Sequence, residues 1–227
     1  MSPFELRAAE LPEEFPVFPL SGALLLPHGK LPLNIFEPRY LAMTEDALAA
    51  RRMFGMIQPD PAGAPIPHGP PLYRVGCLGR LSSFSETEDG RYLITLSGVI
   101  RFAVAEELAT RRGYRRVRGD FSAFLADLRP PEPSGLDRKA MLQALRRYFA
   151  GRGFDANWEA VDALDDEALV ITLCMVCPFD PAEKQALLEA PTAADRASAL
   201  LALLQIDAHS PGTDPGPDNA SSRRLAS

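Results

Sequence analysis

The chain has 227 residues, of which 46% are hydrophobic and 24% are charged, and its formal net charge is −6. This composition is typical of a globular protein and excludes a collagen-like or fully disordered chain. The longest apolar run, residues 169–179, is shorter than the roughly 20 residues that a membrane-spanning helix needs. The surplus of acidic residues argues against a general attraction to nucleic acid or anionic membranes.

The N-terminus lacks the basic start and apolar stretch of a secretory signal. The three cysteines show no disulfide-framework pattern. We therefore expect a cytoplasmic protein.

Proline-rich segments at 58–71, 129–135 and 209–227 interrupt backbone hydrogen bonding, since proline lacks the N–H. We interpret them as a long loop, a linker and a disordered tail. The predicted division is an N-terminal arm at 1–14, a β subdomain at 15–128, a linker at 129–135, a helical subdomain at 136–207 and a tail at 208–227.

The β subdomain is predicted from short β-branched and aromatic segments, with separate strands at 91–99 and 100–108. Asp89-Gly90 predicts the turn of a hairpin, because glycine adopts positive φ readily. One helix should interrupt the strands after Glu37-Pro38, where proline fits the first helical turn.

Beyond the linker, the apolar period becomes helical. Asp180 with Glu183 has the capping-box pattern, and Thr192 with Asp195 is a version of it with aspartate. Helices are expected near 137–150, 156–177 with a break, 181–189 and 193–205.

The CxxC motif at Cys174 and Cys177 could suggest a metal site. Zinc sites take four ligands, however, and His28, His68 and His209 are scattered through predicted loops. We interpret the two cysteines as small buried residues of an apolar helix. No metal or cofactor site is predicted.

No phosphate-binding GxxxxGK[ST] loop, GxGxxG, GxSxG or HExxH motif is present, so no catalytic residue is predicted. Carboxylates that meet only in space leave an enzyme as one alternative. The basic run from Arg111 to Arg118 could bind phosphates while Tyr114 stacks on a base. Such a run more often lies on a solvated strand, which is the interpretation we favour.

Residues 15–59 resemble the opening of the Lon protease N-terminal domain family. The matching elements are Pro19-Leu20, Leu24 to Pro27, Leu33 to Glu37, and Arg39-Tyr40. The likeness continues over 75–102 and, more weakly, over 184–204. It implies an α+β fold in which a small PUA-like β-barrel precedes a C-terminal helical bundle.

Within this resemblance the motif residues fit a structural framework. Leu33, Ile35 and Phe36 are expected to fill the barrel, and Glu37 with Arg39 to hold the strand-to-helix corner. The glycines expected to allow close or bent strands are Gly76, Gly79 and Gly98.

Lon proteases continue into ATPase and peptidase domains, and this chain ends before either, so a stand-alone member is expected. The resemblance implies a non-enzymatic module that binds unfolded or partner polypeptide and is linked to protein quality control. The candidate contact residues are Leu26 and Pro27 after the second strand, with Ile66 and Leu72 in or beside the long loop. For each, a loop packed back on the barrel is the alternative. RNA binding through Arg111 to Arg118 is the alternative function, because PUA-like barrels also occur on RNA.

Overall fold

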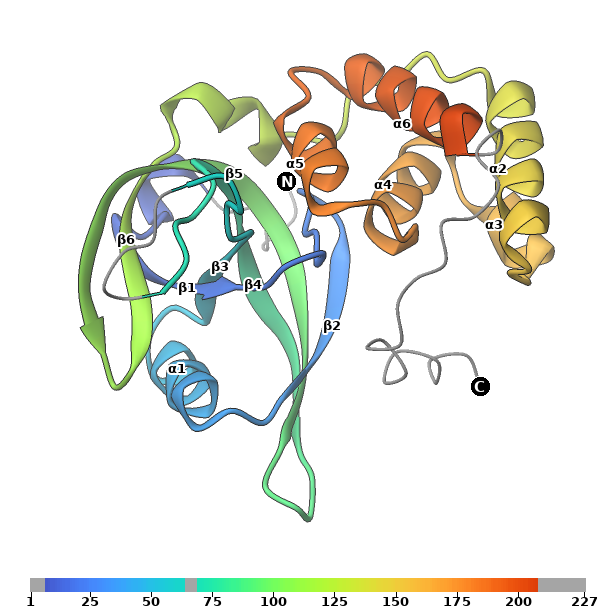
Figure 1. Cartoon of the computed structure of the whole chain (residues 1–227). Coiled ribbons are helices and arrows are strands. Elements are labelled where there is room, and N and C mark those ends of the chain that lie inside the picture. The colour runs from blue at the N-terminus through green and yellow to red at the C-terminus, as the bar shows by residue number, and fades with distance from the viewer. Residues whose placement is uncertain (1–6, 64–68, 208–227) are drawn as a thin grey trace.

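The computed structural model describes residues 7–63 and 69–207, and it places a mixed β-sheet beside a group of helices (Figure 1). The first part contains η1 (Ala8–Glu10), β1 (Glu14–Pro19), β2 (Lys30–Ile35), α1 (Pro38–Ala49), β3 (Met53–Ile57), β4 (Val75–Glu86), β5 (Tyr92–Arg111), β6 (Tyr114–Asp120) and η2 (Ser122–Leu128). The second part contains α2 (Arg138–Arg152), α3 (Trp158–Ala163), α4 (Asp166–Val176), α5 (Pro181–Glu189) and α6 (Ala193–Asp207).

The strands run in the order β2-β5-β4-β3-β1-β6, with β1 and β3 parallel and the other neighbours antiparallel. The C-terminal half of β5 also pairs with β6. The strands β5, β4, β3, β1 and β6 therefore form a closed ring, and β2 lies at the edge outside it. The predicted α+β order of strands before helices is confirmed. The narrower assignment to a PUA-like barrel stays a prediction.

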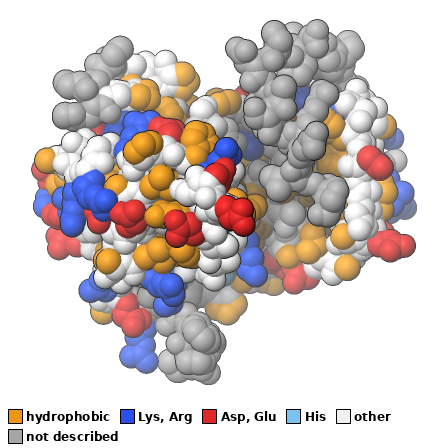
Figure 2. Space-filling model, turned by 90° about the horizontal axis from the view of Figure 1, so that it is seen from below, with side chains coloured by type: hydrophobic (Ala, Val, Ile, Leu, Met, Phe, Trp, Pro, Cys, Tyr) orange, Lys and Arg blue, Asp and Glu red, His pale blue; other side chains and the backbone are white. Residues whose placement is uncertain are grey.

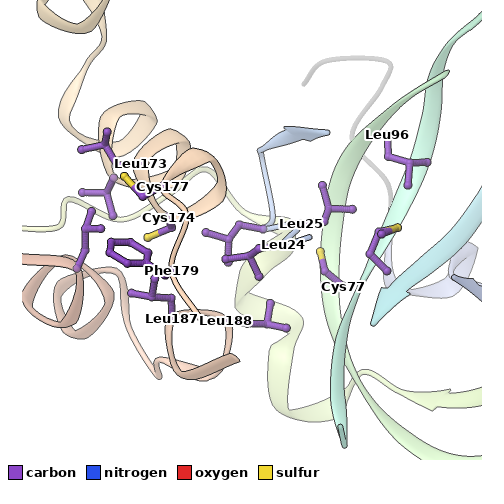
Figure 3. Packing of buried hydrophobic residues seen from close by; sticks show 14 of the residues in the cluster. Leu24, Leu25, Cys77, Leu96, Leu173, Cys174, Cys177, Phe179, Leu187 and Leu188 are labelled. Atoms are coloured by element: carbon purple, nitrogen blue, oxygen red, sulfur yellow. The ribbon is translucent and has the colours of Figure 1, made fainter. Parts of the chain in front are cut away.

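Buried side chains form two clusters. One comes from all five strands of the closed ring: Phe15, Val17, Met53, Ile57, Leu78, Ile100, Phe102 and Val117. Within it, the rings of Phe15 and Phe102 pack in a T-shaped arrangement with 4.9 Å between their centroids. The other cluster continues from the sheet into the helices, and Leu24 and Leu25 lie between the two parts (Figure 3).

The helices follow the predicted pattern closely. α5 begins and ends at the predicted residues, and the expected break divides α3 from α4. Asp180 and Glu183 form the capping box, and Thr192 and Asp195 exchange hydrogen bonds at the start of α6. These signals succeed because a helix cap depends on residues close in sequence.

Two local predictions are wrong. The segments 91–99 and 100–108 form one strand, β5, which continues through Gly98 with only a shift in its register against β4 between Gly98 and Ile100. Phe36 does not fill the barrel: its side chain is 62% exposed, while the preceding Ile35 is buried. Successive residues of an extended chain point to opposite sides, so only one of the two can face the core.

Several smaller expectations are met. Gly90 has a φ of +77° in the turn between β4 and β5, Pro38 begins α1, and Arg39 forms an ion pair with Glu37 at 2.8 Å. Cys174 and Cys177 are buried, and burial raises the pKa of each thiol to about 12. Over residues 7–63 and 69–207, no helix combines the length and the apolar character needed to span a membrane.

Candidate functional site

A cleft lies between the sheet and the helices. It consists of a larger cavity of about 610 Å³ and a smaller cavity of about 270 Å³. The two cavities share four wall residues, His28, Pro131, Glu167 and Ile171. Because they share a wall, we treat them as one site and call it the central cleft.

The larger cavity has an apolar wall made by one side of α4. This helix is apolar nearly all round, so the side opposite its buried residues still presents hydrophobic groups. Ile171, Met175 and Val176 line the cavity, and Val176 is 62% exposed. The facing wall is the start of β2 and the two residues before it, and a Cβ at Gly29 would lie only 2.4 Å from Met175 Sδ. The glycine therefore allows α4 to pack against the strand.

The smaller cavity combines proline rings with buried charge. Pro27, Pro130, Pro131 and Pro191 contribute apolar surface. Arg101 from β5 pairs with Asp127 of η2 through two hydrogen bonds of 2.9 Å. Its remaining nitrogen donates to the carbonyl oxygens of Leu188 and Ala190, at 3.2 and 2.8 Å. Arg101 thus joins the sheet, η2 and the segment after α5.

Two polar atoms at the same cavity have no hydrogen-bond partner among the residues that the structure describes. The Nε of Arg196 donates to the carbonyl oxygen of Leu187 at 2.9 Å, but its buried Nη2 has no hydrogen-bond partner within the described part of the chain. The hydroxyl of Ser134 is likewise buried and unpaired in that part, although its backbone N–H donates to Glu167. Buried polar groups are nearly always paired, so this pair of atoms is unusual.

Metal binding has no support in the residues that the structure describes. No three or more His, Cys, Asp and Glu side chains among them are grouped so as to hold an ion.

Residues 14–205 match the family model described as the ATP-dependent protease La (LON) substrate-binding domain. The chain belongs to this family. It is 28% identical over 202 residues to Lon protease 1 of Bdellovibrio bacteriovorus, covering 84% of this chain and 24% of that protein. It is 27% identical over 201 residues to Lon protease 1 of Thermus thermophilus, covering 86% of this chain and 25% of that protein. The chain therefore spans about a quarter of the length of these two Lon proteases.

Solved structures share the fold. The crystal structure of a Lon N-terminal domain protein from Xanthomonas campestris superposes with a TM-score of 0.55 at 23% identity, over 83% of this chain and 97% of that one. The N-terminal domain of a Mycobacterium avium complex Lon protease gives a TM-score of 0.55 at 15% identity, over 84% and 97% of the two chains. The arrangement of sheet and helices is thus that of Lon N-terminal domains.

Of the three predicted contact residues that the structure describes, only Pro27 lines the cleft of this Lon domain. Leu26 is completely buried, so it packs back on the sheet instead of lying exposed as a contact residue. This is the alternative given for it in the sequence analysis. Pro27 is also buried but lines the smaller cavity. Leu72 is half-buried and bridges to Pro59, away from the cleft, and Ile66 lies outside the described residues. The sequence missed Ser134, Val176 and Arg196, which carry no local motif.

The basic run is neutralised by acidic neighbours. Arg112, Arg115, Arg116 and Arg118 each form an ion pair with at least one carboxylate, and Arg111 pairs with Asp46 at 3.4 Å. Tyr114 is 2% exposed and donates to Asp46 at 2.6 Å, so its ring is not free to stack on a base. The face in Figure 2 shows basic and acidic side chains intermixed over the sheet part. These contacts favour the solvated-strand interpretation over RNA binding.

Proposed function

We propose that this Lon substrate-binding domain binds polypeptide in an unfolded or extended form in the central cleft, without cleaving it. One observation carries the proposal: the apolar wall of α4, with Ile171, Met175 and Val176, faces the start of an edge strand. Family membership supports a polypeptide as the ligand, because the family is described as a substrate-binding domain.

An extended chain suits these two walls. Its apolar side chains would contact α4, and its backbone would lie near β2. Among the described residues, β2 pairs with a strand on one side only. Full burial of one large aliphatic side chain contributes roughly 1.5–3 kcal/mol. Ordering the bound segment offsets much of that gain, so we expect modest affinity.

The lack of cleavage is part of the same proposal. Its support is the family's description as a substrate-binding domain rather than a peptidase. A bound polypeptide would then be passed on intact to a separate proteolytic machine, which is the proposed link to protein quality control. The proposal also places the chain in the cytoplasm, where such substrates occur.

A charge introduced into the apolar wall tests the site. Val176→Lys should weaken binding of an unfolded model protein about tenfold, because a charge replaces an apolar contact. Lysine is chosen because a cation is tolerated at the last residue of a helix. The measurement is a binding isotherm by fluorescence anisotropy without ATP, followed by the intact mass of the substrate.

The matched control is Leu93→Lys, at a residue that is 47% exposed on β5 and outside the cleft. This variant should bind as the unchanged protein does, and both variants should keep its melting temperature. Weaker binding in Leu93→Lys alone would move the contact surface to the β4–β5 hairpin. Cleaved substrate, or tight capture of short RNA with no polypeptide binding, would contradict the proposal.

A further inference from the structure

Arg196, at the wall of the smaller cavity, is a cation without an ion-pair partner among the residues that the structure describes. It lies in the first turn of α6, where its Nε donates a hydrogen bond to Leu187. Its Nη2 is buried and has no hydrogen-bond partner in the described part of the chain. No carboxylate oxygen of residues 7–63 or 69–207 lies within 4.0 Å of its guanidinium nitrogens. Burial, and then the nearby charge of Arg101, lower the pKa of Arg196. Both effects would be relieved by a bound anion.

Arg101, in the same cavity, shows what a completed site looks like in this fold. Its guanidinium has a carboxylate on one side and two carbonyl oxygens on the other. Arg196 has a carbonyl oxygen on one side and an open cavity on the other. The contrast indicates that, within residues 7–63 and 69–207, the Nη2 of Arg196 lacks a hydrogen-bond acceptor.

Ser134 is an independent observation at the same place. Its residue is 5% exposed, its hydroxyl has no hydrogen-bond partner among the described residues, and it lines the smaller cavity. A hydroxyl can donate, as can the guanidinium. The start of α6 adds the positive end of a helix dipole, since Thr192 and Ala193 also line the cavity. The arginine, the hydroxyl and the start of the helix therefore all favour the binding of a negatively charged group in this cavity.

The charges around the cavity select a carboxylate rather than a phosphate. Its lining contains three arginines and three carboxylates, namely Arg101, Arg129, Arg196, Asp127, Glu132 and Glu167. With Arg101 already paired to Asp127, the two remaining arginines are balanced by Glu132 and Glu167, so the lining has no surplus positive charge to hold a dianion. A single negative charge matches Arg196, whose Nη2 has no hydrogen-bond partner among the described residues.

The apolar lining selects a carboxylate attached to a hydrophobic group. Four proline rings and Ile171 surround the polar atoms, and the cavity is smaller than the one it joins. A polypeptide end fits this arrangement, with its last side chain among the prolines and the preceding residues along α4. An Asp or Glu side chain in the middle of a polypeptide fits less well, because the residue that carries its carboxylate has no hydrophobic group to contact the prolines.

We propose that the smaller cavity binds the C-terminal carboxylate of the polypeptide, with Arg196 and Ser134 donating hydrogen bonds to it. This inference rests on the proposed function, because the rest of the polypeptide lies in the larger cavity. It adds a preference for free chain ends that end in an apolar residue.

The test compares two forms of one short unstructured peptide that ends in leucine, as the free acid and as the C-terminal amide. The unchanged protein should bind the acid about tenfold more tightly, as expected for one charge-assisted interaction. Arg196→Gln should bind both forms with the affinity that the unchanged protein has for the amide. Arg147→Gln, at an exposed arginine of α2, is the matched control and should keep the tenfold preference.

The outcomes separate this inference from the proposed function. Equal binding of acid and amide by the unchanged protein would overturn the carboxylate site and leave polypeptide binding standing, and this comparison needs no variant to fold. An amidated peptide with an internal glutamate that bound as tightly as the free acid would also overturn it. Binding of neither form would contradict polypeptide binding itself.

Discussion

Gly98 is the residue at which the wall of the cleft meets the sheet. A Cβ at this position would lie 1.9 Å from the carbonyl oxygen of Leu26. The backbones touch because Gly98 N–H donates to Gly29 at 2.8 Å and His28 N–H donates to Gly98 at 3.0 Å. This contact holds Pro27 and His28 where they line the cleft.

Gly98→Ala should therefore lower the free energy of unfolding by about 1–3 kcal/mol or more, because a methyl group would meet backbone atoms that have little freedom to move. The matched control is Gly151→Ala, where nothing lies within 4 Å of the added Cβ in α2. This change should stabilise the protein by up to about 1 kcal/mol, since alanine favours a helix. Urea denaturation of both variants tests the pair, and equal stability of the two would contradict the close approach.

Single residues also show what a sequence can and cannot specify. Gly98 could be picked out because glycine at a fixed place in a strand suggests a close approach. Phe36 could not be placed, since a large apolar residue beside Ile35 fits either side of the chain until the strand has a partner. Its side depends on the register of β2 with β5, which pairs Ile35 with Tyr92.

Among the elements, β6 is attached to α1 by a buried tyrosine. Tyr114 donates to Asp46 of α1, and Arg112 from the same turn also contacts Asp46 at 2.9 Å. Burial, and then the bond to Asp46, raise the pKa of Tyr114 to about 12. The hydrogen bond from Tyr114 is the main cause that lowers the pKa of Asp46.

These shifts predict how the Tyr114 contact depends on pH. Because the pKa of Tyr114 is raised in the folded state, its contribution is complete below about pH 10 and is lost as the pH rises toward 12. Because the pKa of Asp46 is lowered, its contribution is present above about pH 4 and is lost as the pH falls through the folded-state value.

Tyr114→Phe should thus lower the free energy of unfolding by about 1.5–3 kcal/mol near neutral pH and by less at both extremes. Urea denaturation of the two proteins at about pH 3, 7 and 11 gives the comparison. A difference that stays constant across the three values would show that the hydroxyl contributes through packing alone.

At the level of elements, the sequence predicts helices better than strands for a physical reason. The caps at Asp180 and Thr192 are local, and their hydrogen bonds need no distant partner. The length of β5 is not local, because it pairs with β2, β4 and β6 at different points along its length. Its continuation through Gly98 follows from those three partners.

The central cleft is a property of the whole molecule. Its wall combines Pro27, Ser134, Ile171 and Arg196, which are distant in sequence and carry no shared motif. The family resemblance could suggest polypeptide binding, but only the packing of helices on the sheet brings these residues together. Pro27 could be named as a candidate because it ends a motif, whereas a single arginine in a helix, such as Arg196, has the same local sequence signal as a solvent-exposed one.

The shared core predicts that sheet and helices unfold together. One buried hydrophobic cluster includes residues of the sheet and of the helices. Two hydrogen bonds also join the two parts: Gln185 of α5 donates to the carbonyl oxygen of Val75 in β4 at 3.0 Å, and Lys184 donates to that of Gly22 at 2.7 Å. Trp158, the only tryptophan, lies in α3 and reports on the helical part. Its fluorescence should change at the same temperature as the single calorimetric peak, as two-state unfolding requires.

A change on the sheet side should then be detected in the helices. Leu25 is 1% exposed and approaches Gly79 of β4, so Leu25→Ala should lower stability by about 2–5 kcal/mol. If the core is shared, the Trp158 transition moves by as much as the calorimetric peak. Leu125→Ala, at a 46% exposed residue of η2, is the control and should leave both unchanged. A Trp158 transition that stays in place while the calorimetric peak moves or divides would show two independent subdomains, and the cleft between them would then be free to open without unfolding either one.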